Sequence, residues 1–212
     1  MPDVGVETEQ RMTPEPLSDG VADDELLEKI AAGDAGAFTT LFRRHQPLVY
    51  RFALHMTGSP TVAEDVTQEV FLAVMGDAAR YQAGRATAVS WLCGIARNHA
   101  WRRLDRDRRL VALVEDDEGE HATGDEAPHP LEAITRAEEV EALHRALLTL
   151  PVPYREAIAL CDLQELNYVD AAAALDCAVG TIRSRLHRGR ALLAAKMRPD
   201  PPSGKPVTRC LV

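Results

Sequence analysis

Residues 162–198 read DLQELNYVDAAAALDCAVGTIRSRLHRGRALLAAKMR, and their pattern predicts the fold of the C-terminal part of the chain. Apolar residues recur at spacings of three and four from Leu163 to Leu175, the period breaks over residues 176–180, and it restarts at Ile182. This pattern predicts two helices joined by a tight turn. The second helix is strongly basic, and residues 181–198 contain no acid.

Positive charge on the second of two such helices predicts a helix-turn-helix, which places that helix in the major groove of DNA. Arginine side chains suit this position because their planar forks match guanine O6 and N7 and also bind phosphates. The alternative interpretation is a solvated basic helix that closes a helical bundle.

The rest of the chain predicts helices as well. Its 212 residues can hold one or two small domains, and no stretch alternates with period two for long enough to suggest a sheet. We therefore expect an all-α protein. No run of eighteen apolar residues occurs, and the acidic, proline-rich N-terminus does not resemble a signal peptide, so we expect a cytoplasmic location.

Catalytic and metal-binding patterns are not found in the sequence. The cysteines are widely scattered, without the paired Cys or His spacing of a zinc site or a disulfide framework. No glycine-rich phosphate loop and no nucleophile with a plausible base occurs. We expect neither an enzyme nor a bound cofactor or metal.

The formal net charge of −9 is unevenly distributed. Acids gather in the N-terminal third and over residues 115–126, whereas basic residues gather over residues 97–109 and after Gly180. DNA repels an acidic chain over a Debye length of about 10 Å at 0.1 M salt. We therefore expect the protein alone to bind DNA weakly. We also expect a large partner that itself binds DNA and so brings the protein to it.

Composition divides the chain into two small helical domains joined by a flexible acidic linker. The predicted parts are a disordered tail (1–21), a first helical domain (22–110), the linker (111–130), a second helical domain (131–198) and a second tail (199–212).

Capping signals place the helices of the first domain. Asp23 or Asp24 is predicted to cap a short helix that stops at Gly33. Ser59 is predicted to cap a later helix that begins with Pro60 and runs to about residue 74. A loop over residues 76–87 precedes a further helix over residues 90–109.

Two helix faces of the first domain suggest binding. Asp65, Gln68, Glu69 and Leu72 follow at helical spacing and form an acidic stripe with an apolar anchor, which suits a basic protein surface; an ordinary solvated face is the alternative. Asn98, Trp101 and Arg102 share another face, where a ring beside a guanidinium suits unstacked bases. Simple packing of the tryptophan is the alternative there.

Four motifs, taken in order, carry a resemblance: DVTQEVFLAV (65–74), SWLCGIARNHAWRRL (90–104), LPVPYREAIAL (150–160) and GTIRSRLHRGRALL (180–193). Over about residues 22–198 the chain resembles bacterial RNA polymerase sigma factors of the extracytoplasmic-function class of the sigma-70 family. The resemblance implies that residues 22–110 are region 2 and residues 131–198 are region 4. It further implies a protein that binds core RNA polymerase and directs promoter-specific initiation without catalysis of its own.

The resemblance also implies partners and residue roles. The polymerase would be contacted at the clamp helices of its largest subunit and at its flap region, and an anti-sigma factor is an expected regulator. The residues that the resemblance implies for polymerase binding are Asp65, Gln68, Glu69 and Leu72. Contacts with the minus-10 element fall to Asn98, Trp101, Arg102, Arg103 and Arg106, with the loop over residues 81–87. Contacts with the minus-35 element fall to Thr181, Arg183, Ser184, Arg185, His187 and Arg188.

The sequence departs from the family pattern at Glu165 and Asp176, where glycine is usual, and at Ala178, where a proline or serine usually starts the recognition helix. Aspartate adopts left-handed geometry more readily than most residues, so we expect the turn to survive. The acidic linker either threads a basic channel of the polymerase or is a simple tether. A stand-alone helix-turn-helix regulator is the alternative function, although it leaves the motif at 65–74 unexplained.

Overall fold

Local capping sets most helix boundaries of the N-terminal half in the computed structural model, which describes residues 20–115 and 136–198. Helix α1 (Asp23–Ala31) ends just before Gly33, whose φ is +91°. Helix α2 (Ala35–Thr57) begins where the Asp34 carboxylate accepts hydrogen bonds from the Gly36 and Ala37 amides at 2.8 and 3.0 Å. Helix α3 (Pro60–Asp77) begins at Ser59, whose hydroxyl accepts from the Val62 amide.

The predicted cap of α1 is wrong. Ala22 precedes the helix and no side chain caps it. The Asp23 carboxylate instead binds Arg44 and lies 2.8 Å from Nε2 of His45. Partners on another helix have therefore drawn this carboxylate away from the free amides of its own helix.

The remaining elements are also helical. A short 3₁₀ turn, η1 (Ala78–Arg80), leads by a loop into α4 (Ala88–Glu115). The C-terminal part contains α5 (Arg136–Leu148), α6 (Val152–Ile158), the π-turn η2 (Ala159–Leu163), α7 (Tyr168–Ala174) and α8 (Val179–Lys196). No strand occurs within the described residues, and the all-α prediction is confirmed.

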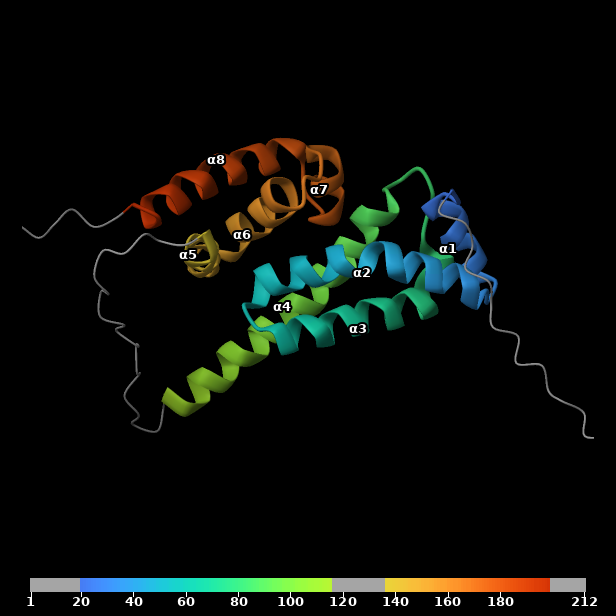
Figure 1. Cartoon of the computed structure of the whole chain (residues 1–212), viewed down its shortest axis with the longest axis horizontal. Helices are drawn as coiled ribbons and strands as arrows, with labels where there is room; N and C mark the ends of the chain where they lie inside the picture. The colour runs from blue at the N-terminus through green and yellow to red at the C-terminus, as the bar shows by residue number, and fades with distance from the viewer. Residues whose placement is uncertain (1–19, 116–135, 199–212) are drawn as a thin grey trace, which may run out of the picture.

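Helices α1 to α4 form one bundle, and α5 to α8 lie on the side of it formed by α2 and α4 (Figure 1). Fully buried side chains on α2, α3 and α4 make the first core, including Leu41, Phe52, Val66 and Leu92. Burying each of these large apolar side chains stabilises the fold by about 1.5–3 kcal/mol.

The second core is smaller and lies between α6, α7 and α8. Ile158, Leu175, Ile182 and Leu186 are buried there. Helices α6 and α8 approach closely at Gly189, where an added Cβ would lie 3.0 Å from Cδ1 of Ile158. A side chain at position 189 would therefore require Ile158 and Tyr154 to shift.

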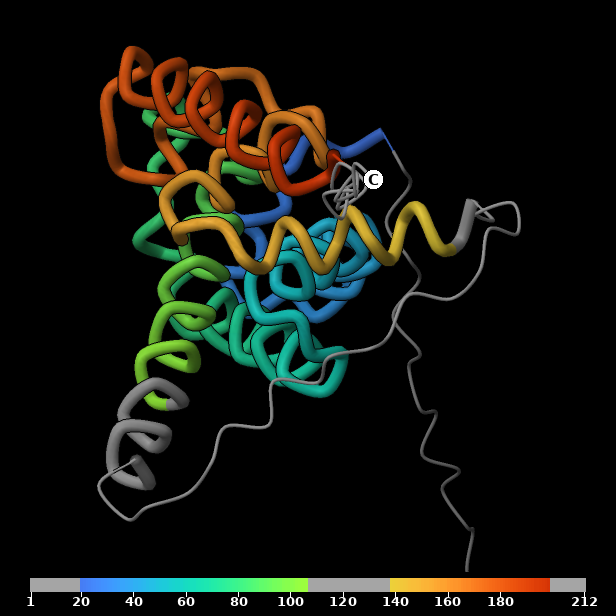
Figure 2. Tube along the Cα trace, turned by 90° about the vertical axis from the view of Figure 1, so that its left-hand side faces the viewer, coloured from blue at the N-terminus to red at the C-terminus, as the bar shows by residue number. Residues whose placement is uncertain are grey.

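The two bundles share one continuous apolar cluster. Helix α5 crosses α2, and α7 lies against α4 (Figure 2). None of the helices in the described part of the chain is both long and apolar enough to cross a bilayer. The predicted tails and linker fall largely on residues 1–19, 116–135 and 199–212, which lie outside the described residues.

Candidate nucleic-acid interface

Helices α7 and α8 with their connecting turn form the predicted helix-turn-helix. Asn167 caps α7, because its side-chain oxygen accepts hydrogen bonds from the amides of Val169 and Asp170 at 3.0 and 2.9 Å. Asp176 lies in the turn with a φ of 47°, in the left-handed region. Ala178 precedes α8 and makes no side-chain cap. The departures at 176 and 178 thus leave the turn formed but one helix end uncapped.

Helix α8 has one buried face and one basic face. Ile182, Leu186 and Gly189 are buried toward the domain core. Thr181 and Arg185 are half-buried, with Nη1 of Arg185 4.0 Å from Sγ of Cys177. The exposed residues of the predicted DNA-binding set are Arg183, Ser184, His187 and Arg188. These four side chains can reach base edges or phosphates.

The acidic stripe of α3 is partly occupied by residues of α4. The Glu69 carboxylate accepts from Arg103 and lies 2.7 Å from Nδ1 of His99, and Asp65 lies 3.5 Å from Arg103. Although partial burial raises it, the hydrogen bonds from Arg103 and His99 hold the pKa of Glu69 below its ordinary value. Gln68 and Leu72 remain exposed.

The predicted nucleic-acid face of α4 is largely open. Arg97, Asn98, Trp101 and Arg102 line a hollow of about 470 Å³. Arg106 is exposed one turn further along the helix. The guanidinium of Arg97 lies 5.7 Å from the centre of the Trp101 ring, within the range of a cation–π contact.

Two family models match the chain: Sigma-70 region 2 at residues 41–110 and Sigma-70, region 4 at residues 140–193. The chain is 31% identical over 183 residues to the RNA polymerase sigma-H factor of Pseudomonas aeruginosa, which covers 84% of this chain and 94% of that protein. It belongs to the extracytoplasmic-function class of the sigma-70 family.

Two further proteins are similar to this sigma factor. The ECF RNA polymerase sigma factor SigE of Mycolicibacterium smegmatis is 38% identical over 166 residues, which is 76% of this chain but only 62% of that relative's length. The structure of the sigma factor RpoE in complex with the anti-sigma factor NepR from Bartonella quintana is 27% identical, has a TM-score of 0.60, and covers 77% of this chain and 98% of that one.

An apolar surface of the sigma factor lies beside the α3 stripe. Leu72 and Met75 are each 59% exposed and line a hollow of about 370 Å³ between α2 and α3. Phe42 and Phe71 also line it and meet edge to face, with ring centres 4.8 Å apart. Exposed apolar side chains around a hollow suit contact with another protein.

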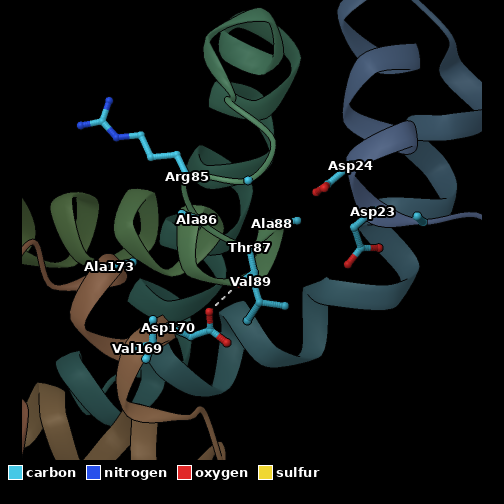
Figure 3. A pocket seen from close by; sticks show the side chains of 12 residues that line it. Asp23, Asp24, Arg85, Ala86, Thr87, Ala88, Val89, Val169, Asp170 and Ala173 are labelled. Carbon is cyan, nitrogen blue, oxygen red and sulfur yellow. Dashed lines mark hydrogen bonds between the residues drawn. The ribbon is translucent and has the colours of Figure 1, made fainter. Parts of the chain in front are cut away.

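The loop over residues 81–87 lies beside α1 and α7. The Tyr81 hydroxyl is within hydrogen-bonding distance of the Asp24 carboxylate and the Ala86 carbonyl, and burial together with Asp24 raises its pKa. The Thr87 hydroxyl donates to the Asp170 carboxylate of α7 at 3.1 Å. Figure 3 shows this contact at the edge of a pocket of about 510 Å³ that separates α1 from α7.

Sequence reasoning missed Glu156. This residue lies on α6 with a fully buried side chain, and its Oε1 atom accepts hydrogen bonds from Nε of Arg97 at 2.7 Å and Nε1 of Trp101 at 2.6 Å. The available signal was a lone acid followed by the apolar run from Ala157 to Leu160. A buried carboxylate needs partners, but the sequence does not say where they lie.

Proposed function

We propose that this sigma factor recruits core RNA polymerase to promoters and that its two domains bind different targets. Residues 22–110 would bind the polymerase and the minus-10 element, and residues 131–198 would bind the minus-35 element. The observation that carries the proposal is the exposed basic face of α8 on a helix-turn-helix, on the same chain as the open Arg, Asn and Trp face of α4.

Recognition of the minus-35 element is assigned to α8. Arg183 and Arg188 are exposed and have the donor geometry that guanine and phosphate oxygens require. Ser184 and His187 lie on the same exposed face, whereas Thr181 and Arg185 stand at its edge. Losing one base-contacting arginine is expected to cost about 1–3 kcal/mol of promoter binding.

Recognition of the minus-10 element is assigned to α4. Trp101 offers a ring on which an unpaired base can stack, and Asn98 and Arg102 offer polar groups beside it. Arg106 would hold a backbone phosphate. Arg103, by contrast, already binds Glu69 and Asp65. Its contribution to DNA binding would therefore come at the expense of that contact.

Polymerase binding is assigned to the exposed part of the α3 stripe. Leu72 and Gln68 are free to enter an interface, and the hollow beside Leu72 extends the apolar part of this surface. Asp65 and Glu69 would contribute charge at the rim. Apolar anchors in the centre of an interface usually supply most of the binding energy, so Leu72 is the principal residue.

The protein would act in the cytoplasm without chemistry of its own, since the polymerase forms the bonds. An anti-sigma factor would regulate it, as the RpoE–NepR complex indicates for a protein similar to this one. No observation favours a stand-alone regulator.

The test is run-off transcription from a promoter library with purified bacterial core polymerase, with and without the protein. We expect initiation that depends on the protein and promoters that share two sequence elements. The variant Arg188→Ala should reduce this initiation, whereas Lys196→Ala, which removes a charge from the far end of α8, should not. Equal transcription with and without the protein, together with tight duplex binding by the protein alone, would make it a regulator instead.

A further inference from the structure

The side chain of Glu156 connects the two domains. It lies on α6 of region 4 and is 1% exposed, yet both groups that donate to Oε1 belong to α4 of region 2. Oε2 is buried and has no hydrogen-bond partner. The carboxylate therefore depends on Arg97 and Trp101 for its stabilisation.

These two donors belong to the face of α4 to which minus-10 recognition is assigned. Arg97 and Trp101 line the same hollow as Asn98 and Arg102. A phosphate oxygen would use the guanidinium that Glu156 now occupies, because both are anionic acceptors with similar geometry. A DNA group that accepted a hydrogen bond from Nε1 of Trp101 would likewise have to displace Glu156. Glu156 and promoter DNA therefore compete for these two donors.

Region 4 also borders the loop over residues 81–87, most of which is exposed. Helix α7 contributes Ala173, and the turn after it contributes Asp176, to a hollow of about 420 Å³ whose other walls include Tyr81, Arg85 and Trp91. The bond from Thr87 to Asp170 closes one edge of this area. Region 4 thus contacts both parts of the proposed minus-10 surface.

Two further contacts hold the domains in this arrangement. Arg155, next to Glu156 on α6, is buried and donates to the Met56 carbonyl at the end of α2 at 2.6 Å. Helices α4 and α7 meet closely at Gly94, where an added Cβ would lie 3.4 Å from the Ala174 carbonyl oxygen. A side chain larger than alanine at position 94 would push α7 away.

We infer that Glu156 is an internal competitor for promoter DNA, which holds the free protein closed and two donors of its minus-10 surface, on Arg97 and Trp101, occupied until region 4 is drawn away. This inference rests on the proposed function of α4. It adds a regulatory contact within the chain that would act before any anti-sigma partner.

The first measurement is the radius of gyration of the full-length free protein by small-angle X-ray scattering. Glu156→Gln removes the carboxylate charge while keeping the side chain's shape, and it should increase the radius. Gly94→Leu should also increase the radius, because its side chain would press against α7 while Glu156 is intact. This variant tests the separation of the domains if Glu156→Gln does not fold. Glu139→Gln, which makes the same charge change at an exposed site on α5, should leave the radius unchanged.

The second measurement is binding of the free proteins to a fluorescein-labelled, random-sequence single-stranded DNA by anisotropy. Glu156→Gln should bind about tenfold more tightly than the wild type, the effect of losing one competing hydrogen bond to a charged group. Glu139→Gln should bind less than about twofold more tightly, since a single exposed charge acts weakly. Circular dichroism checks that each variant is folded.

Unchanged radius and unchanged DNA affinity in both Glu156→Gln and Gly94→Leu would overturn the inference. A larger radius without a gain in DNA affinity would also overturn it, because the contact would then close the protein without competing with DNA. Failure of the proposed function is seen separately, as absence of promoter-dependent run-off transcription by the wild type.

Discussion

Asp162 and Arg190 form a two-bonded ion pair in which Nε and Nη2 of the arginine donate to the two carboxylate oxygens at 2.9 and 2.6 Å. The pair fastens the π-turn η2 to α8 just beyond its exposed basic face. It also removes one arginine from the set available to DNA. Asp162 is therefore expected to limit how far along α8 the DNA contact extends.

Asp162→Asn should free Arg190 and enlarge the basic face. We expect the dependence of log affinity on log salt for nonspecific duplex to steepen by about one, the effect of one more phosphate contact. Filter binding between 50 and 200 mM salt measures this. Glu165→Gln makes the same charge change nearby and is the control; equal slopes in both variants would mean that net charge alone is responsible.

Ala178→Ser should stabilise the protein. The serine hydroxyl can accept a hydrogen bond from one of the free amides of α8, and such a cap contributes about 1 kcal/mol to the free energy of unfolding. Urea denaturation followed by circular dichroism measures the change. Ala191→Ser, at an exposed position in the middle of α8, should instead lower stability by about 0.5 kcal/mol.

Glu165→Gly should stabilise the protein slightly. The φ of Glu165 is 58°, a conformation that costs an L-residue about 1–2 kcal/mol, whereas glycine in place of it costs about 0.5–1 kcal/mol in chain entropy. Glu165→Val should destabilise, because a branched side chain tolerates this region poorly. Thermal unfolding of both variants tests the order; a glycine variant less stable than the wild type would contradict it.

Lowering the pH below 6.5 should destabilise the packing of α2 on α5. The rings of His55 and His144 lie 5.4 Å apart there, and burial, followed by the charges of His144 and Arg51, lowers the pKa of His55 from 6.5 to about 4. Between these values the unfolded chain binds a proton that the folded protein does not. Stability should therefore fall by up to about 1.4 kcal/mol per pH unit.

His55→Gln removes this titrating group. The free energy of unfolding of the variant, measured in urea from pH 7.5 to 4.5, should depend less steeply on pH than that of the wild type. His187→Gln, on the exposed face of α8, is the matched control and should keep the wild-type slope. Parallel curves for all three proteins would rule out His55 as the cause.

Leu72→Asp should weaken binding to core polymerase. A charge at the centre of an apolar contact should cost about 2 kcal/mol or more, as at other interface hot spots. Val140→Asp, at a similarly exposed apolar position on α5, should have a much smaller effect. Biolayer interferometry with immobilised core polymerase and no DNA gives both affinities, and equal losses in the two variants would refute the assignment.

Local signals predicted much of this fold. The predicted stop of α1 at Gly33 and the predicted cap of α3 by Ser59 involve only backbone groups close in the chain, so the sequence contains both partners. The left-handed Asp176 and the uncapped start of α8 were likewise readable from the residue types at those positions. The outward face of α8 followed from helical spacing alone.

Contacts between distant segments could not be predicted. Asp23 failed as a cap because its partners lie 21 and 22 residues away on α2. Glu156 binds residues 59 and 55 positions earlier in the chain, and only the packing of the two domains brings them together. Likewise, helical spacing placed Asp65 and Glu69 on one stripe but did not reveal that Arg103 neutralises part of it.

The packing of α5 and α6 on α2 has a consequence for the lifetime of the protein. Leu147 and Leu150 are buried in this arrangement. Separated domains would present more apolar surface to chaperones and more open backbone to proteases. The packing of the two domains should therefore also protect the newly made protein until it binds polymerase, and variants that separate the domains should be degraded faster in cells.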